Sequence, residues 1–246
     1  MTKTILILGG TAEARSLADQ AVAQWPDARV VTSLAGRTKS PRLPRGEIET
    51  GGFGGADGLA DYLVRENVDV LIDATHPFAA EISRNAERAA AGAGVPRLVL
   101  ARPPWSFAGN TNVRHVPDLP GVHDALASAV RIFLAIGRQE VAAFAPGTGK
   151  FFLLRFIDPP ASPPNFAGCR VLTGRPESVA EETNLLQSHR IDTVVAKNGG
   201  SDASRAKIDA ALALGLSVIL IDPPPPPMPP RAGTVDAAIN WIAKNI

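Results

Sequence analysis

The sequence has no pair of cysteines, few aromatic residues and no surplus of charge of either sign. Cys169 is the single cysteine among 246 residues, so neither an internal disulfide nor a cysteine-pair metal site can form. Lys and Arg number 25 against 24 Asp and Glu, a balance that excludes the basic surface of a nucleic-acid binder. Aromatic residues make up 5%, too few for a surface that stacks bases or sugars. We therefore expect a cytoplasmic protein without a metal site or nucleic-acid partner.

Long hydrophobic runs are missing as well. No apolar run reaches the ~18 residues that a membrane span needs. The first run, Ile5–Leu8, is shorter than a signal-peptide core and ends in glycines. The sequence thus predicts no membrane partner, and it is compatible with a monomer or a small homo-oligomer.

Several catalytic motifs are also absent. Tyr62 is the only tyrosine and has no lysine four residues later, so the Tyr-Lys pair of short-chain dehydrogenases is lacking. No nucleophile elbow, Walker lysine or zinc-protease motif is present. We therefore expect a cofactor to carry the chemistry and the protein to position it.

Short apolar runs alternate with amphipathic, alanine-rich stretches along the whole chain. This alternation is typical of βαβ units and a parallel sheet. The expected strands are residues 4–8, 29–33, 47–50, 68–73, 97–100, 131–136, 151–156, 170–172, 193–196 and 218–221. The expected helices are residues 12–24, 56–66, 79–91, 139–144, 179–188, 204–214 and 234–244.

The regular pattern breaks at the segment Arg102–Trp105, which contains two prolines. The predicted fold class is therefore α/β, with two Rossmann-like lobes, mostly parallel sheets and an interlobe cleft as the default binding site. Residues 1–110 are expected to form a domain that binds NADP. Residues 111–246 are expected to form a second, substrate-binding α/β domain, including the proline-rich segment 223–230 and a closing helix.

The first strand is followed by Gly9, Gly10 and Thr11 and then by a helix. Glycines let the backbone approach a phosphate, and a helix N-terminus supplies N–H groups and partial positive charge. The spacing favours a dinucleotide site, although it is not G-x-G-x-x-G, and a purely structural turn is the alternative. Thr11 can cap the helix or donate its hydroxyl to a phosphate.

The end of the second strand indicates which dinucleotide is bound. NAD-selective folds place an acid there, whereas this segment has Ser33 and Arg37 and no acid. Arg37 can hold a 2′-phosphate through its forked guanidinium, so NADPH is favoured. The alternative is a solvated basic loop.

Other strands also end in polar loops, which line the ligand crevice of an open α/β sheet. Thr75, His76 and Pro77 are placed near the nicotinamide or the substrate, or they form a capped turn with Pro77 in its first helical position. Lys197 and Asn198 are placed to hold a substrate carboxylate, or they belong to a glycine-rich turn with a surface lysine. Two further loops of this kind carry Arg138 and Arg175.

Five segments occur in order along the chain: ILGGTAEAR at 7–15, GGFGG at 51–55, DATHPFA at 73–79, RPPW at 102–105 and AKNGG at 196–200. Together they resemble the precorrin-6A reductase family of cobalamin biosynthesis. The resemblance implies a two-lobed, Rossmann-like reductase. Such an enzyme uses NADPH to reduce one double bond of the macrocycle precorrin-6A, giving precorrin-6B.

The resemblance also implies roles for individual residues. The coenzyme turn would comprise Gly9, Gly10, Thr11, Glu13 and Ala14, with Ser33 and Arg37 at the 2′-phosphate and Thr75, His76 and Pro77 near the nicotinamide. The substrate bears several carboxylates, so the substrate-binding candidates are Arg15, Arg102, Arg138, Arg175, Lys197 and Asn198. The candidate catalytic residues are His76, as a proton donor in competition with water, and Lys197.

Two other functions are compatible with the sequence. One is a non-catalytic NADP-sensing protein whose second lobe binds a partner, and the other is an NADP-dependent dehydrogenase of a small metabolite. The polar strand-end loops of the second lobe favour an enzyme, because a sensor would present an exposed apolar patch there.

Overall fold

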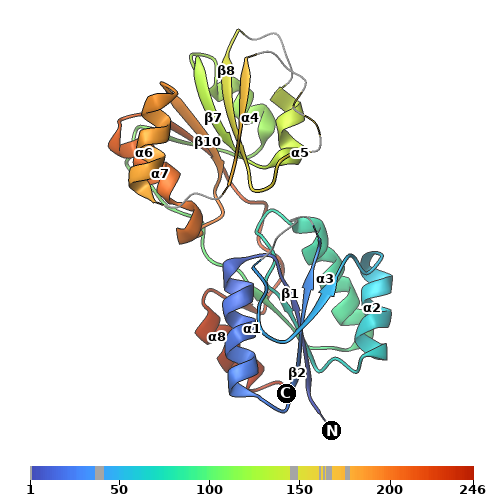
Figure 1. The fold of residues 1–246 in the computed structure, drawn as a ribbon. Coiled ribbons are helices and arrows are strands. Elements are labelled where there is room, and N and C mark those ends of the chain that lie inside the picture. Colours follow the sequence, from blue (N-terminus) through green and yellow to red (C-terminus); the bar gives the residue numbers. More distant parts are fainter. Residues whose placement is uncertain are drawn as a thin grey trace. The chain divides into compact units, whose positions relative to one another are not determined.

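The structure is a computed structural model that describes residues 2–36, 42–144, 149–160, 162, 164, 168–174 and 178–246. The chain forms two compact units. The first comprises Met1–Pro103 and Pro224–Ile246, and the second comprises Pro104–Pro223. Each unit is an α/β structure built on its own sheet, as Figure 1 shows.

The first unit contains a six-stranded parallel sheet in the order β12-β5-β4-β1-β2-β3. Its strands are β1 (Thr4–Leu8), β2 (Arg29–Leu34), β3 (Glu47–Thr50), β4 (Val70–Asp73), β5 (Arg97–Leu100) and β12 (Arg231–Ala232). Its helices are α1 (Ala12–Gln24), α2 (Gly55–Arg65), α3 (Ala80–Ala93) and α8 (Val235–Ile242). In Figure 1, α1 and α8 lie on one face of the sheet and α2 and α3 on the other.

The continuous apolar run of β1 follows from this layering. Ile5 and Ile7 pack in a core with α1 and α8, whereas Leu6 and Leu8 pack in a core with α2 and α3. Successive side chains of a strand point to opposite faces, so a strand covered on both sides needs apolar residues at every position.

The second unit contains another six-stranded parallel sheet, in the order β6-β11-β10-β7-β8-β9. Its strands are β6 (Val113–Val116), β7 (Arg131–Ala135), β8 (Phe151–Phe156), β9 (Cys169–Thr173), β10 (Thr193–Lys197) and β11 (Ser217–Ile221). Its helices are α4 (Leu119–Ala125), α5 (Arg138–Val141), η1 (Ala142–Phe144), α6 (Val179–Ser188), η2 (Asp202–Ser204) and α7 (Ala206–Ala213). The predicted pair of α/β lobes with parallel sheets is thus confirmed.

The division of the chain differs from the expected boundary between residues 110 and 111. The first crossing falls between Pro103 and Pro104, and the chain crosses back between Pro223 and Pro224. The closing helix α8 therefore belongs to the first unit, where Ile239 and Ile242 share a core with Leu17 of α1. Periodicity identifies the apolar face of a helix but not the sheet that this face covers.

Two features common in other proteins are missing from the described ranges. None of their helices combines the length and the apolar character that crossing a lipid bilayer requires. Nor do these ranges contain a group of three or more His, Cys, Asp or Glu residues placed to hold a metal ion.

Candidate functional site

The turn between β1 and α1 is tightly packed on one side and open on the other. The Gly9 N–H donates to the Ser33 carbonyl (N···O 2.8 Å). A Cβ on Gly9 would lie 2.8 Å from Thr32 Cγ2, so a side chain there would displace its neighbour. Gly10 has a φ of +110°, and a Cβ on it would have no atom within 4 Å. The open space over Gly10 lets a ligand approach the backbone at the start of α1.

Thr11 joins this turn to the loop after β4. Its Oγ1 accepts a hydrogen bond from Ala14 N–H (3.1 Å) and so caps α1. The same hydroxyl donates to the Ala74 carbonyl (2.9 Å), so its proton is already used. Of the two functions predicted for Thr11, the structure has the helix cap. The hydroxyl proton is bonded to the Ala74 carbonyl, so it is not available to a phosphate.

Glu13 forms an ion pair with Arg102 within the first unit. In the sequence-based prediction, Glu13 belonged to the coenzyme site and Arg102 to the substrate site. The Arg102 side chain is largely buried, and Glu13 lies in the first turn of α1. An unpaired carboxylate at this position would repel a bound phosphate. Arg102 neutralises it, which preserves the favourable field of the helix N-terminus for an anion.

Ser33 lies at the end of β2, directly beside the glycine turn. It is buried, and its register partner in β1 is Leu8. Arg37, the other residue predicted to contact a 2′-phosphate, lies outside the described residues. Positions 33–36 contain no acidic residue. The described end of β2 therefore lacks the carboxylate that NAD-selective folds have there, which is the reason for favouring NADPH over NADH.

The loop from β4 to α3 is organised by Asp73, which was not among the predicted site residues. Asp73 Oδ1 accepts hydrogen bonds from the backbone N–H of Thr75 (3.2 Å) and from its hydroxyl (2.7 Å). His76 Nδ1 accepts a hydrogen bond from Phe78 N–H (3.3 Å). The proton of a neutral His76 is therefore on Nε2. An acidic residue at the carboxyl end of a buried strand was the signal that could have identified Asp73.

A cavity of about 340 Å³ adjoins this loop within the first unit. The segment Pro224–Met228, here called the proline strap, forms one of its walls. The strap is fixed at Met228, whose carbonyl accepts a hydrogen bond from Arg97 Nη2 (3.1 Å). The other lining residues are Asp73, Thr75, His76, Pro77, Ala80, Ser83, Arg84, Glu87, Val99, Leu100 and Ala101. The predicted Thr75, His76 and Pro77 thus share one pocket.

In the second unit, Lys197 is the last residue of β10, one position beyond the predicted end of this strand, and Asn198 follows it. The two side chains have different surroundings. Lys197 forms an ion pair with Glu140 of α5. Asn198 is buried, with 1% of its surface exposed, and its amide bonds Trp105 and Asp222. Asn198 therefore anchors the chain near both crossings between the units.

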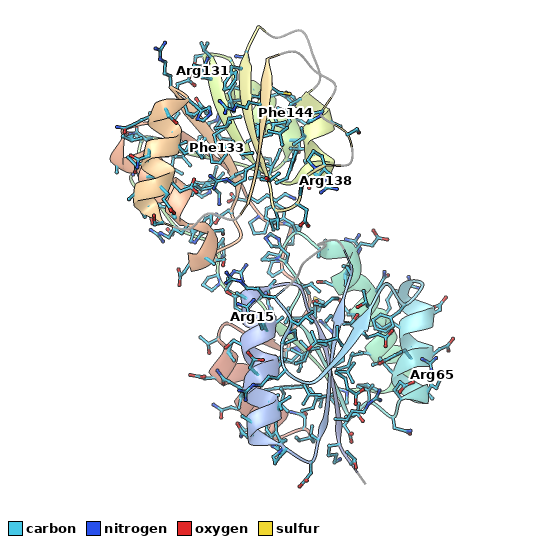
Figure 2. All side chains as sticks on the ribbon, in the orientation of Figure 1. Arg15, Arg65, Arg131, Phe133, Arg138 and Phe144 are labelled. Atoms are coloured by element: carbon cyan, nitrogen blue, oxygen red, sulfur yellow. The ribbon has the colours of Figure 1, made fainter. Side chains whose placement is uncertain are left out.

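The remaining predicted cations in the described residues belong to different units, Arg15 to the first and Arg138 to the second. Figure 2 shows Arg15 near the beginning of α1 and Arg138 at α5. Within the described residues no hydrogen bond or ion pair is found for the Arg15 side chain, whereas Arg138 Nη2 donates to the Asp158 carbonyl (3.3 Å). Arg175 lies outside the described residues.

A second feature that sequence reasoning missed is a buried charge cluster in the second unit. Arg155 of β8 forms an ion pair with Glu182 of α6, which is 1% exposed. Lys207 of α7 is also buried, and its Nζ donates to the Ser204 carbonyl. Burial lowers the pKa of Lys207 to about 8, although Glu182 favours its charged form.

A parallel sheet with a glycine turn leading into a capped helix defines a Rossmann-like, nucleotide-binding class of α/β protein. Residues 4–243 match the family model of "Precorrin-6x reductase CbiJ/CobK". The chain belongs to this family of reductases, which confirms the resemblance found in the sequence.

Individual relatives agree with this assignment. The chain is 49% identical over 244 residues to a precorrin-6A reductase of Rhodococcus erythropolis, an alignment covering 97% of this chain and 96% of the relative. It is 44% identical over 241 residues to a precorrin-6A reductase of Rhodobacter capsulatus, covering 97% and 95%. It is similar to the solved structure of "CobK precorrin-6A reductase", with a TM-score of 0.89 and 40% identity over 99% of this chain and 97% of that one.

Proposed function

We propose that this oxidoreductase reduces one double bond of precorrin-6A with NADPH, in the pathway to cobalamin. The observation that carries the proposal is the turn at Gly9 and Gly10, which is open to a ligand at the capped start of α1. The 49% identity to a precorrin-6A reductase supports the choice of substrate. NADPH is a coenzyme of the cell interior, so we place the reaction in the cytoplasm.

The first unit has residues that fit the coenzyme. The backbone N–H groups of Gly10, Thr11 and Glu13 would hold the pyrophosphate, with Arg102 neutralising the Glu13 side chain. The N–H groups of Gly9 and Ala14 already donate within the protein, so these two residues would shape the turn. Ser33 and Arg37 would hold the 2′-phosphate. Thr75, His76 and Pro77 would lie near the nicotinamide. When bound, NADPH supplies the hydride, and one proton completes the reduction of the double bond.

The substrate's carboxylates call for cations, and we assign this role to Arg15, Arg138, Arg175 and Lys197. Lys197 already pairs with Glu140, so a substrate carboxylate would share its charge. Arg102 and Asn198 are better explained as positioning residues, since their side chains bind Glu13 and Trp105. His76 remains the candidate proton donor, because its neutral form carries the proton on Nε2.

The names of the relatives bear on the metal content of the substrate. The relatives that are 49% and 44% identical to this chain are both named precorrin-6A reductase, without cobalt, whereas relatives named cobalt-precorrin-6A reductase are 25–28% identical. We therefore propose that the metal-free macrocycle is the substrate.

The function is tested by incubating the protein with NADPH and either metal-free or cobalt-containing precorrin-6A. We expect oxidation of NADPH and a mass gain of two hydrogen atoms in the tetrapyrrole, with the metal-free substrate turned over faster. Folded protein that binds NADPH but turns over neither substrate would favour the NADP-sensing alternative.

A further inference from the structure

Only half of the buried Asp73 carboxylate is used within the protein. Asp73 is 1% exposed, and its Oδ1 accepts both hydrogen bonds from Thr75. Its Oδ2 is buried and has no hydrogen-bond partner among the described residues. A buried charged oxygen without a hydrogen-bond partner lowers the stability of the folded protein. We therefore expect a ligand or a trapped water to donate a hydrogen bond to Oδ2.

The position of Asp73 favours a ligand. Asp73 ends β4 and lines the cavity beneath the proline strap. The loop that follows it is tied to the glycine turn, because Ala74 accepts the hydrogen bond from Thr11. Ligands of open α/β sheets bind at the carboxyl ends of the strands, where this pocket and that turn meet.

The chemistry of the pocket restricts what can bind beside Asp73. Val99, Leu100 and the prolines of the strap give apolar walls that suit a flat ring. The free oxygen is an acceptor on a carboxylate, so it repels an anionic group and favours an N–H donor. The required ligand is therefore a planar ring that carries an uncharged N–H donor.

We propose that Asp73 positions the nicotinamide of the coenzyme, its Oδ2 accepting a hydrogen bond from the carboxamide N–H in the pocket beneath the proline strap. This inference rests on the proposed function, because it takes the coenzyme to be NADPH. Two groups of the coenzyme are uncharged N–H donors on a planar ring, the adenine amine and the nicotinamide carboxamide. The proposed 2′-phosphate site of the adenosine half is at Ser33 of β2, whereas Asp73 ends β4 on the other side of β1, so the carboxamide is the group expected beside Asp73. Asp73 would thereby fix the orientation of the reactive ring.

Coenzyme analogues test the proposal without altering the protein. The thionicotinamide analogue of NADPH keeps the amide N–H, whereas the 3-acetylpyridine analogue replaces the amide with a methyl ketone. We expect the protein to bind the acetylpyridine analogue roughly tenfold or more weakly than the other two in calorimetric titrations. Equal affinities for all three coenzymes would overturn the proposal.

Asp73→Asn sharpens the test because it can keep the hydrogen bonds to Thr75 while replacing the free acceptor with an N–H donor. This variant should lose most of the roughly tenfold preference for NADPH over the acetylpyridine analogue, because its N–H donor can pair with the carbonyl oxygen that both rings carry. Glu81→Gln, an exposed change of the same kind on α3, should leave the ranking unaltered. A variant that weakens both coenzymes equally would indicate a trapped water or a structural carboxylate and would contradict the proposal.

A fragment of the coenzyme separates this proposal from the proposed function. Adenosine 2′,5′-bisphosphate lacks the nicotinamide, so Asp73→Asn should bind it as tightly as the unaltered protein does. If the fragment binds and the analogues show no discrimination, the inference about Asp73 fails while the coenzyme assignment stands. If neither the fragment nor NADPH binds to folded protein, the proposed function itself fails.

Discussion

Asn198 holds Trp105 through both ends of its amide. Its Oδ1 accepts from the Trp105 N–H (2.8 Å), and its Nδ2 donates to the Trp105 carbonyl (3.1 Å). The same Nδ2 donates to Asp222 Oδ1 (3.0 Å). One side chain at the end of β10 thus fixes the segments that adjoin the two crossings, at Pro103–Pro104 and Pro223–Pro224.

Replacing Asn198 should therefore destabilise the second unit. Asn198→Ala leaves the buried N–H and carbonyl of Trp105 without partners, at a cost of about 3 kcal/mol of unfolding free energy. The change is measured by urea unfolding in a Trp25→Phe/Trp241→Phe background, in which Trp105 is the only fluorescent tryptophan. Asn245→Ala, at an exposed position, should shift the unfolding free energy by no more than about 0.5 kcal/mol. A similarly small shift for Asn198→Ala would contradict the anchoring role.

Gly10→Val should weaken coenzyme binding. The backbone at Gly10 has a φ of +110°, which strains a β-branched residue, and the new side chain fills the space open to a ligand. We expect the dissociation constant of NADPH to rise by roughly tenfold or more, as measured by calorimetry. Gly92→Ala in helix α3 has neither problem and should leave NADPH binding intact while stabilising the helix slightly. Unaltered affinity in Gly10→Val would place the coenzyme elsewhere.

The ion pair between Glu13 and Arg102 predicts that substituting Glu13 restores the coenzyme affinity lost on substituting Arg102. Arg102→Gln exposes the anionic coenzyme to an uncompensated carboxylate, so NADPH affinity should fall by roughly tenfold. Adding Glu13→Gln removes that charge and should restore most of the affinity. Binding is compared in a double-mutant cycle of the four proteins. A double variant as weak as Arg102→Gln would mean that Arg102 contacts the ligand directly.

Arg37→Glu should discriminate between the two nicotinamide coenzymes. Reversing a charge that pairs with the 2′-phosphate should weaken NADPH by roughly tenfold to hundredfold and leave NADH nearly unchanged. Dissociation constants for both coenzymes, measured by fluorescence titration, check this expectation. Arg88→Glu, an exposed charge reversal on α3, serves as the matched control. An equal loss for both coenzymes would remove Arg37 from the phosphate site.

The burial of Lys207 predicts a dependence of stability on pH. Its pKa is lowered from 10.5 to about 8 in the folded state, so the unfolded chain binds the extra proton between these values. The unfolding free energy should therefore rise as the pH increases from about 8 towards 10.5, by up to about 3 kcal/mol, because the penalty for burying the cation disappears.

The effect of Lys207 is isolated by comparing urea unfolding of the unaltered protein with that of Lys207→Met across this pH range. Glu182 and Arg155 remain in both proteins, so the difference in slope belongs to the lysine. The exposed Lys244→Met should keep the slope of the unaltered protein. Parallel curves for Lys207→Met and the unaltered protein would show that Lys207 titrates normally.

The regular elements were predictable where burial imposes an unbroken apolar pattern. Both β1 and β10 fall within one residue of their predicted limits, because a strand covered on both faces has little freedom in its sequence. The edge strands β6 and β12 were not predicted. β6 contains Arg114 and His115, both exposed, and β12 has two residues beside a proline-rich run. Such strands are defined by their neighbours rather than by their own composition.

The loops that carry polar residues were predictable, but the partners of those residues were not. An Asn at the end of a strand can either bind a ligand or hold a neighbouring segment of the chain. For Asn198, only the position of Trp105 in the fold shows that it holds a segment. Arg102 was predicted to bind the substrate, whereas the structure pairs it with Glu13. Glu13 is 89 positions away, so no residue near Arg102 in the sequence indicates this partner. Side-chain pairing across such separations depends on the complete fold.

The return of the chain to its first unit has a consequence for synthesis on the ribosome. The apolar side chains of β1 and α1 that α8 covers cannot be shielded when the first hundred or so residues have emerged. They stay exposed until the second unit and then α8 have been made, although chains are generally able to fold domain by domain as they emerge. The N-terminal half is consequently a nascent chain with an open core, a state in which chaperone binding would protect it from aggregation.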